Sequence, residues 1–304
     1  MYRKKMNPIN RFIDRVGEKG LLDSLGAGWS VATGALDYWL NPLAKRQSKV
    51  APQDYEQIRS DLLRVGLNVT AYRVNTAEFD DWLSKADFGQ AYRDAYAELF
   101  REKVFEHYLG AKLLELGAGD VFIDVAAAKS PWYKMVPALY GCRESYCLDL
   151  AYAPGIHSQQ IGADATDTPL PDGFAGKIAL HCAYETFEGS ADAKLPTEAG
   201  RLLRPGGRMV ILPLYLHNFY FVHVGPYADR RGLDYQGAKR IWREDIKGLR
   251  FSRKYSVQAF AERVVKNLNG LVLHIFFIEN ISEVVPNGYC RFAALFCKPD
   301  GRGN

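Results

Sequence analysis

Apolar residues near the N-terminus recur at alternating steps of three and four residues, which is the spacing of a single helix face. The series starts at Leu22 and ends at Leu43. Glycines at positions 26, 28 and 34 weaken the helix, and Asn41-Pro42 predicts a break near its end. The pattern therefore predicts an amphipathic helix over residues 22–43.

Aromatic and apolar residues at helical spacing dominate a second stretch, from Thr76 to Leu116. We interpret this stretch as a helical lid or scaffold that leads into the rest of the chain. Together with the first helix, it predicts a helical N-terminal extension over residues 1–100. The main domain is then expected to occupy residues 101–304.

Beyond Gly119 the pattern changes to short apolar runs of strand length that alternate with helical stretches. The predicted strands are Val121–Val125, Ser145–Asp149, Gln159–Ile161, Lys177–Cys182, Arg208–Leu214, Leu271–Ile278 and Tyr289–Cys297. Such alternation is typical of an α/β fold with a doubly wound, seven-stranded, mostly parallel sheet. The last two runs flank Pro286-Asn287-Gly288 and predict a terminal hairpin, so the last strand is expected to be antiparallel.

An insertion at about residues 218–256 interrupts this alternation, and its stretch from Arg230 to Tyr255 is rich in arginine, lysine and tyrosine. One interpretation is a solvated helical insertion. The other is a part of an acceptor pocket, because aromatic faces with cationic side chains suit a sugar or an anionic small molecule.

The composition is that of an ordinary globular protein, with 48% apolar and 24% charged residues among 304. A net charge of +4 is too small to indicate a nucleic-acid partner, and no run of 18 apolar residues predicts a spanning helix. The five cysteines are odd in number and form no C-x-x-C pair, which argues against a disulfide framework and a structural zinc site. No metal site is predicted, and the cytoplasm is the expected location.

Small and acidic residues follow the predicted strands, where a doubly wound sheet binds its ligands. The first strand runs into Asp124, and three alanines at 126–128 follow, whose small side chains let a ligand approach the backbone. The second strand ends in Asp149, a position suited to accept hydrogen bonds from ribose hydroxyls. Taken singly, each feature also has an ordinary explanation as a turn.

The order of these features resembles the class I S-adenosylmethionine-dependent methyltransferase family. Two further elements carry the resemblance: G-x-D-A-x-x-x-P-x-P at Gly162–Pro171 and R-x-L-x-P-G-G at Arg201–Gly207. The detailed match covers roughly residues 119–215, and it departs from the family at alanines 126–128, where a glycine-rich loop is usual. The resemblance implies the seven-stranded fold and S-adenosyl-L-methionine as cofactor.

The resemblance also implies roles for individual residues. Asp149 is expected to hold the ribose hydroxyls, Asp164 to accept from the adenine amino group, and the backbone at Ala126 to meet the methionine moiety. The full set of implied cofactor-binding residues is Asp124, Ala126, Ala128, Asp149, Leu150, Asp164 and Ala165.

Methyl transfer to a hydroxyl needs a group that accepts the proton. His181, at the end of the fourth strand, is the predicted base because an imidazole titrates near neutrality, and Glu185 is predicted to orient it or the acceptor. The alternative is that His181 is a hydrogen-bonded core histidine and Glu185 caps the next helix. Segments 180–189 and 102–107 also resemble a bacterial subgroup associated with surface glycans, so the expected acceptor is a small molecule or a glycan.

Two other functions stay open at this point. A methyltransferase-like binding protein without chemistry is compatible with the three alanines. A nicotinamide-dependent oxidoreductase shares the acidic second strand, but the chain lacks its G-x-G-x-x-G fingerprint. The N-terminal helix either lies on an anionic membrane surface, which the basic residues upstream favour, or packs on the protein itself, a partner or a second subunit.

Overall fold

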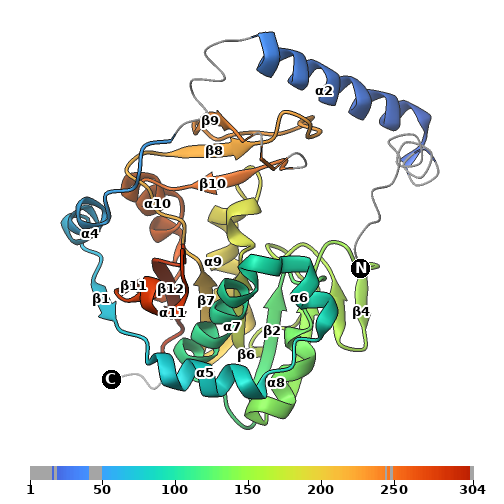
Figure 1. The fold of residues 1–304 in the computed structure, drawn as a ribbon. Helices are drawn as coiled ribbons and strands as arrows, with labels where there is room; N and C mark the ends of the chain where they lie inside the picture. Colours follow the sequence, from blue (N-terminus) through green and yellow to red (C-terminus); the bar gives the residue numbers. More distant parts are fainter. Residues whose placement is uncertain (1–15, 17–18, 41–49, 244, 247–248, 302–304) are drawn as a thin grey trace.

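A computed structural model describes residues 16, 19–40, 50–243, 245–246 and 249–301. Its centre is a nine-stranded sheet with helices on both faces (Figure 1). The strands are β1 (Val69–Tyr72), β2 (Val121–Val125), β3 (Glu144–Leu148), β4 (Gly155–His157), β5 (Gln160–Gly162), β6 (Ala175–His181), β7 (Leu203–Leu212), β11 (Val272–Ile278) and β12 (Phe292–Cys297).

The strand order is β1-β11-β12-β7-β6-β2-β3-β5-β4. Strands β5, β3, β2, β6 and β7 pair in parallel, whereas β12 is antiparallel to both β7 and β11. The predicted doubly wound, mostly parallel sheet with an antiparallel last strand is therefore confirmed. Two edge strands, β1 and β4, raise the number of strands above the seven that were predicted.

Strand β1 changes the predicted division of the chain, because it lies before residue 100 and pairs with β11 of the main sheet. The N-terminal part of the chain thus contributes an edge to the sheet besides its helices. The helices outside the insertion are α4 (Tyr55–Arg64), α5 (Thr76–Lys85), α6 (Gln90–Tyr96), α7 (Phe100–Leu114), α8 (Trp132–Tyr140), α9 (Ala191–Leu202), α10 (Val257–Arg263) and α11 (Ile281–Val284).

The stretch predicted as helical from Thr76 to Leu116 is divided into α5, α6 and α7. Gly89, with φ of +74°, precedes α6, and Ala97, with φ of +45°, ends it. Left-handed backbone cannot continue a right-handed helix, so each of these residues turns the chain. The helices consequently fold back, and α7 lies across β6 and β7.

The central strands are buried on both faces, which explains their continuous apolar runs. Successive side chains alternate between two apolar clusters: Ile123 and Val125 of β2 belong to one, and Phe122 belongs to the other. In β6, Ile178 and Leu180 alternate with Ala179 in the same way. The first cluster packs beneath α9 and α10, and the second beneath α7 and α8.

The insertion is a small sheet and not the helical segment that was one of its two interpretations. Its strands β8 (Phe221–Val224), β9 (Lys239–Trp242) and β10 (Ser252–Lys254) pair in the order β10-β8-β9. Buried Val222, Val224 and Trp242 form an apolar cluster of their own, so alternate strand positions, and not a helix face, carry the apolar side chains.

Helix α2 (Leu21–Leu40) packs on this small sheet at one end of the molecule (Figure 1). The predicted break at Asn41-Pro42 lies outside the described residues. In the part of the chain that the structure describes, no helix is long and apolar enough to cross a membrane. All five cysteines have free thiols.

Candidate functional site

Two cavities lie at the carboxyl ends of the parallel strands. The chain proceeds from β2 to β3 and β5 on one side and then to β6 on the other side of β2, so the strand order switches between β2 and β6. Ligands of doubly wound sheets bind at such a switch. The larger cavity has a volume of about 580 Å³ and the smaller about 280 Å³. Ala126 and Asp149 line both, so the two cavities adjoin.

The larger cavity brings together most of the residues predicted to bind the cofactor. Those that line it are Ala126, Asp149, Leu150, Asp164 and Ala165, and Ala128 lines the smaller cavity. These residues follow the ends of β2, β3 and β5, which lie at residues 125, 148 and 162 of the chain but are adjacent in the sheet. Parallel pairing is what unites them, because it places all carboxyl ends at one edge.

The turn after β2 adopts the backbone that a glycine would normally supply. Ala126 has a φ of +56°, a left-handed conformation that costs an alanine roughly 1–2 kcal/mol. Its N–H donates to Leu148 O over 2.7 Å, which holds the turn against β3. The alanine therefore takes the glycine conformation of the related motif at a cost in strain, and its methyl group borders both cavities.

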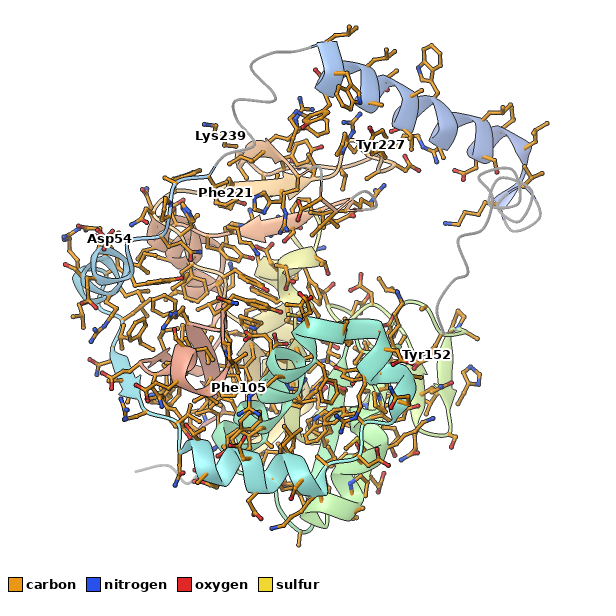
Figure 2. The ribbon with its side chains drawn as sticks, in the orientation of Figure 1. Asp54, Phe105, Tyr152, Phe221, Tyr227 and Lys239 are labelled. Atoms are coloured by element: carbon orange, nitrogen blue, oxygen red, sulfur yellow. The ribbon has the colours of Figure 1, made fainter. Side chains whose placement is uncertain are left out.

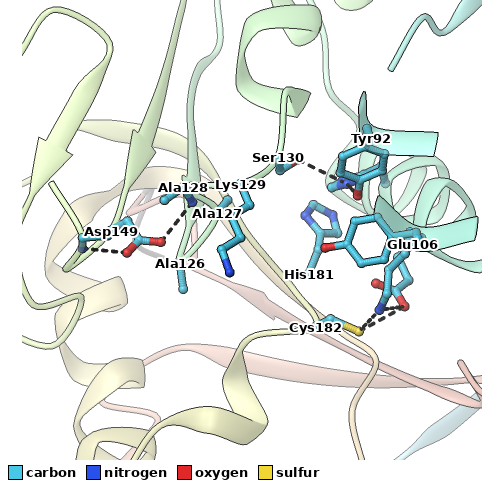
Figure 3. A pocket seen from close by; sticks show the side chains of 14 residues that line it. Tyr92, Glu106, Ala126, Ala127, Ala128, Lys129, Ser130, Asp149, His181 and Cys182 are labelled. Atoms are coloured by element: carbon cyan, nitrogen blue, oxygen red, sulfur yellow. Dashed lines mark hydrogen bonds and ion pairs between the residues drawn. The ribbon is translucent and has the colours of Figure 1, made fainter. Parts of the chain in front are cut away.

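Asp149 is held in place by two backbone donors. The Ala128 N–H donates to Oδ2 over 3.0 Å, and the Ala151 N–H donates to Oδ1 over 2.8 Å (Figure 3). A carboxylate has four lone pairs, so each oxygen retains one for a ligand. Asp164 is fixed similarly, because its Oδ1 accepts from the N–H and the hydroxyl of Thr166, both at 2.9 Å.

Asp124 lies behind the cavities and lines neither of them, which differs from its predicted place beside the methionine moiety. It is fully buried, and its Oδ1 is 3.2 Å from Nδ1 of His181. Its Oδ2 has no hydrogen-bond partner among the described residues. Burial raises the pKa of Asp124, and the hydrogen bond from His181 opposes that rise.

His181 lines the smaller cavity, but its ring is enclosed. Nδ1 faces Asp124, and Nε2 is buried without a hydrogen-bond partner among the described residues. A Cβ atom added to Gly110 of α7 would lie 2.6 Å from Nε2, so this nitrogen is packed against the α7 backbone. The ring also meets that of His107 edge-on, at 4.3 Å between centroids. In this conformation neither nitrogen is presented to a ligand.

Glu185 is not brought together with His181. It lies in a short 3-10 turn after β6 (Tyr184–Thr186), lines neither cavity, and no hydrogen bond joins it to His181 in the described part of the chain. Burial raises the pKa of Glu185, and the charge of Lys254 opposes that rise. The same burial lowers the pKa of Lys254 to about 8.

Helices α6 and α7 supply side chains that the sequence analysis did not assign to the site. Tyr92, Tyr96, Lys103, Glu106 and His107 line the smaller cavity (Figure 3). Lys103 Nζ is 3.3 Å from Glu106 Oε1, and these side chains are only 11% and 1% exposed. Burial lowers the pKa of Lys103, but the charge of Glu106 and the hydrogen bond to Cys182 outweigh burial, and the net pKa is raised.

One feature of the sequence pointed to these residues. Glu102, Lys103, Glu106 and His107 lie among apolar residues on the buried part of α7, and all four are buried. Charged groups leave water only when they are paired or hydrogen-bonded, so a charged cluster on a buried helix indicates an internal polar site. The tertiary fold, and not the local sequence, determines on which face of the sheet this cluster lies.

Comparisons with known proteins found similarity among solved structures alone. No protein-family profile matches the chain, and no curated protein matches it. Among solved structures, a Burkholderia thailandensis 1,6-didemethyltoxoflavin-N1-methyltransferase with bound S-adenosylhomocysteine is 13% identical, with a TM-score of 0.42 over 83% of this chain and 94% of that one.

Two further solved structures are similar at the same level. The Bacillus subtilis YcgJ protein is 14% identical, with a TM-score of 0.40 over 65% of this chain and all of that one. The [4+2]-cyclase SpnF is 15% identical, with a TM-score of 0.41 over 66% of this chain and 82% of that one. Similarity at this level does not establish a shared family or activity.

Proposed function

We propose that this protein is an S-adenosylmethionine-dependent methyltransferase. The observation that carries the proposal is the pair of adjoining cavities at the switch in strand order. The larger is lined by the carboxylates of Asp149, Asp164 and Glu188 together with apolar groups, and the smaller by a buried cation–carboxylate pair. Their contrasting linings match the two ends of this cofactor, a nucleoside and an amino acid. When bound, the cofactor supplies a methyl group on a sulfonium, which is a good electrophile.

The larger cavity suits a nucleoside. Asp149 has free lone pairs for the two ribose hydroxyls, and Asp164, whose Oδ1 is already engaged, has Oδ2 for an exocyclic amine. Leu148, Ala165 and Phe187 offer apolar surface to a flat base. A few fixed polar groups in an apolar cleft are the usual features of a small-molecule site.

The smaller cavity suits the zwitterionic end of an amino acid. Glu106 can accept from an ammonium group, and Lys103 can donate to a carboxylate. Lys129, in the turn after β2, also lines this cavity and adds a second cation. The Lys103–Glu106 pair places a cation and a carboxylate side by side, as recognition of a zwitterion requires.

A dinucleotide fits this site less well. Binding of a pyrophosphate relies on free backbone N–H groups in the first βα turn. Here the N–H groups of Ala126, Ala128 and Ser130 donate to Leu148 O, Asp149 Oδ2 and Ala127 O. The turn therefore has few donors left for a pyrophosphate, which argues against a nicotinamide-dependent oxidoreductase.

In this proposal the methyl acceptor is a hydroxyl group of a small molecule or a glycan. A nucleic acid is not proposed as an acceptor. The polar side chains around the smaller cavity, among them Tyr92, Tyr96 and Ser130, support a hydroxylated ligand. Methyl transfer from a sulfonium depends mainly on alignment, which the rigid strand ends supply. His181 remains our proposed proton acceptor, and this role requires the imidazole ring to turn Nε2 away from α7.

Replacing Asp149 with alanine tests the cofactor assignment. We expect wild-type protein to bind S-adenosylmethionine and S-adenosylhomocysteine in isothermal titration calorimetry. The Asp149→Ala variant should bind about 100-fold more weakly or not at all, because two charge-assisted hydrogen bonds are lost.

Asp167→Ala is the matched control. Asp167 is an exposed aspartate three residues beyond Asp164 that lines neither cavity, and its replacement should change affinity by less than about twofold. A flat titration of folded wild-type protein would remove the cofactor from the proposal. Tight binding without methyl transfer to any extract would instead favour a binding protein that lacks chemistry.

Replacing His181 with asparagine tests the proposed base. Asparagine retains a donor toward Asp124 but cannot take up a proton, so cofactor affinity should stay near the wild-type value. Transfer of labelled methyl groups into a small-molecule extract should fall about 100-fold. The control is His157→Gln at an exposed histidine on β4. Equal rates in wild type and His181→Asn would exclude the base role.

A further inference from the structure

Helix α2 is attached to the protein by its small and polar face. Ser24, Ala27, Gly34 and Tyr38 are the buried residues of the helix. Tyr38 is only 2% exposed and packs edge-on against Trp242, with 5.6 Å between ring centroids. The helix therefore uses one face to hold the small sheet β10-β8-β9.

Glycine allows this close attachment. A Cβ atom at Gly34 would lie 2.0 Å from a guanidinium nitrogen of Arg230, whose backbone N–H donates to Ser30 Oγ over 3.0 Å. Gly26, where a Cβ atom would meet Arg231 at 2.7 Å, and Gly34 thus mark the face that meets the insertion, although glycine is unfavourable in a helix. They make room for its arginines.

The two acidic residues of the helix are also on the attached side. Asp23 pairs with Arg231 at 3.1 Å, and Asp37 pairs with Arg240 at 2.9 Å. The helix has no other charged residue between Leu21 and Leu40. Its outward face is consequently uncharged.

That outward face is a continuous apolar stripe. At 100° per residue, its large side chains fall within an arc of about 100° and extend over roughly 30 Å of helix. Leu22 is 86% exposed and Trp29 74%. The residues of the stripe are Leu21, Leu22, Leu25, Trp29, Leu36, Trp39 and Leu40. Figure 2 shows side chains projecting from α2 away from the molecule. Trp39 lies at the edge of the stripe, where its Nε1 donates to the Tyr227 hydroxyl of the insertion over 3.1 Å.

The stripe is unusual for this protein. Fourteen large apolar residues are exposed in the described chain, and seven of them belong to this one helix. The others are scattered over the rest of the molecule. A contiguous exposed apolar surface marks an interaction site, whereas single exposed apolar residues do not.

The charge around the stripe indicates what it binds. Residues 1–50 contain nine basic and four acidic residues, whereas residues 51–304 contain 30 basic and 31 acidic. All nine basic residues lie in the sequence before or after the helix, within 1–20 and 41–50. An uncharged stripe of leucine and tryptophan between basic segments is the pattern of helices that lie in an anionic membrane surface.

We infer that α2 docks the protein on the surface of a membrane that contains anionic lipid, with the apolar stripe buried at the headgroup boundary and the insertion holding the opposite face. A second copy of the chain is a poorer occupant, since pairing two stripes would bring two basic segments together. The inference is independent of the proposed methyltransferase activity.

Vesicle sedimentation of the full chain tests this inference. The protein should sediment with vesicles of phosphatidylcholine and phosphatidylglycerol, and far less with phosphatidylcholine alone. Raising the salt concentration should weaken the binding, since part of the attraction is between lysine or arginine and lipid headgroups. Circular dichroism should confirm that each variant is folded.

The decisive variant replaces Leu22, Trp29 and Leu36 with serine. It should reduce the vesicle partition coefficient about tenfold or more, because three large apolar side chains no longer enter the lipid. The matched control replaces three exposed apolar residues elsewhere, Leu63, Leu99 and Val272, with serine and should bind as wild type does.

Two results would overturn the inference. One is equal sedimentation of the stripe variant and wild type, which would place the lipid contact elsewhere. The other is a wild-type dimer in light scattering that the stripe variant converts to monomer, without vesicle binding by either protein. In that case the stripe is an interface between copies of the chain.

Discussion

Replacing Asp192 with asparagine should lower the free energy of unfolding by about 3–5 kcal/mol, the usual cost of removing one partner from a buried ion pair. Asp192 is fully buried near the start of α9 and accepts from Arg263 at 2.6 and 2.9 Å and from the Tyr255 hydroxyl at 2.7 Å. It also pairs with Arg253, whose side chain is wholly buried. Asparagine would leave these guanidinium groups without a counter-charge.

The Asp192→Asn substitution should also weaken ligand binding in the larger cavity. Arg253 and Arg263 both donate to Gly189 O, in the loop between β6 and α9 that also contains Glu188, a residue of the cavity wall. Without the Asp192 carboxylate, Arg253 and Arg263 would hold the loop at Gly189 less firmly. We therefore expect weaker nucleoside binding in Asp192→Asn even under conditions in which the variant is folded.

Urea unfolding of both proteins measures the effect. The control is Asp172→Asn, because Asp172 also pairs with an arginine, at 2.8 Å, but its side chain is 82% exposed. The control should lose less than about 1 kcal/mol. Similar losses in both variants would show that burial does not set the strength of the Asp192 pairs.

The pH dependence of this cluster follows from the same contacts. Burial raises the pKa of Asp192, but its arginine partners outweigh burial, and the net pKa is lowered. The ionised carboxylate is therefore favoured in the folded state. Its contribution to stability is present above the ordinary aspartate pKa of 3.8 and is lost as the pH falls through the lower folded-state value.

Replacing Glu102 with glutamine should stabilise the protein at and above neutral pH. Burial and the neighbouring charge of Glu106 raise the pKa of Glu102 to about 7, from an ordinary value of 4.5. Its Oε1 accepts the N–H groups of Tyr289 and Cys290, at 3.2 and 2.9 Å, whereas Oε2 has no partner among the described residues. Glutamine preserves both hydrogen bonds and carries no charge.

The effect should depend on pH in a defined direction. Below pH 4.5 the carboxyl is protonated in both folded and unfolded chains, and glutamine confers no advantage. As the pH rises through about 7 the folded protein must ionise a buried group, at a cost on the order of 3 kcal/mol. The difference in free energy of unfolding between Glu102→Gln and wild type should grow from pH 4.5 to about 7 and level off above that.

Urea unfolding at several pH values between 5 and about 8 measures that growth. Glu98→Gln, at an exposed glutamate one turn earlier, is the control and should follow the wild-type curve. If the Glu102→Gln and wild-type curves run parallel, Glu102 is ionised at no cost in the folded protein. A second carboxylate, Glu106, would then be the group to replace.

The amino-acid sequence alone was enough to predict the central sheet and the residues at its strand ends. Continuous apolar runs such as Val121–Val125 bury both faces of a strand, and that property is local enough to be read from a single segment. The small-residue turn at 126–128 and the carboxylates at 149 and 164 follow such runs. Parallel pairing then brought these three positions to two adjoining cavities.

Long-range contacts in the folded chain determine which side chains complete the site and which face of α2 is exposed. Lys103 and Glu106 reach the smaller cavity because the chain turns at Gly89 and Ala97 and lays α7 across the sheet. The apolar stripe of α2 faces outward because the arginines of the insertion neutralise the acidic side of the helix. Helical periodicity locates an apolar face, but the choice between burying and exposing it depends on long-range contacts that no single segment encodes.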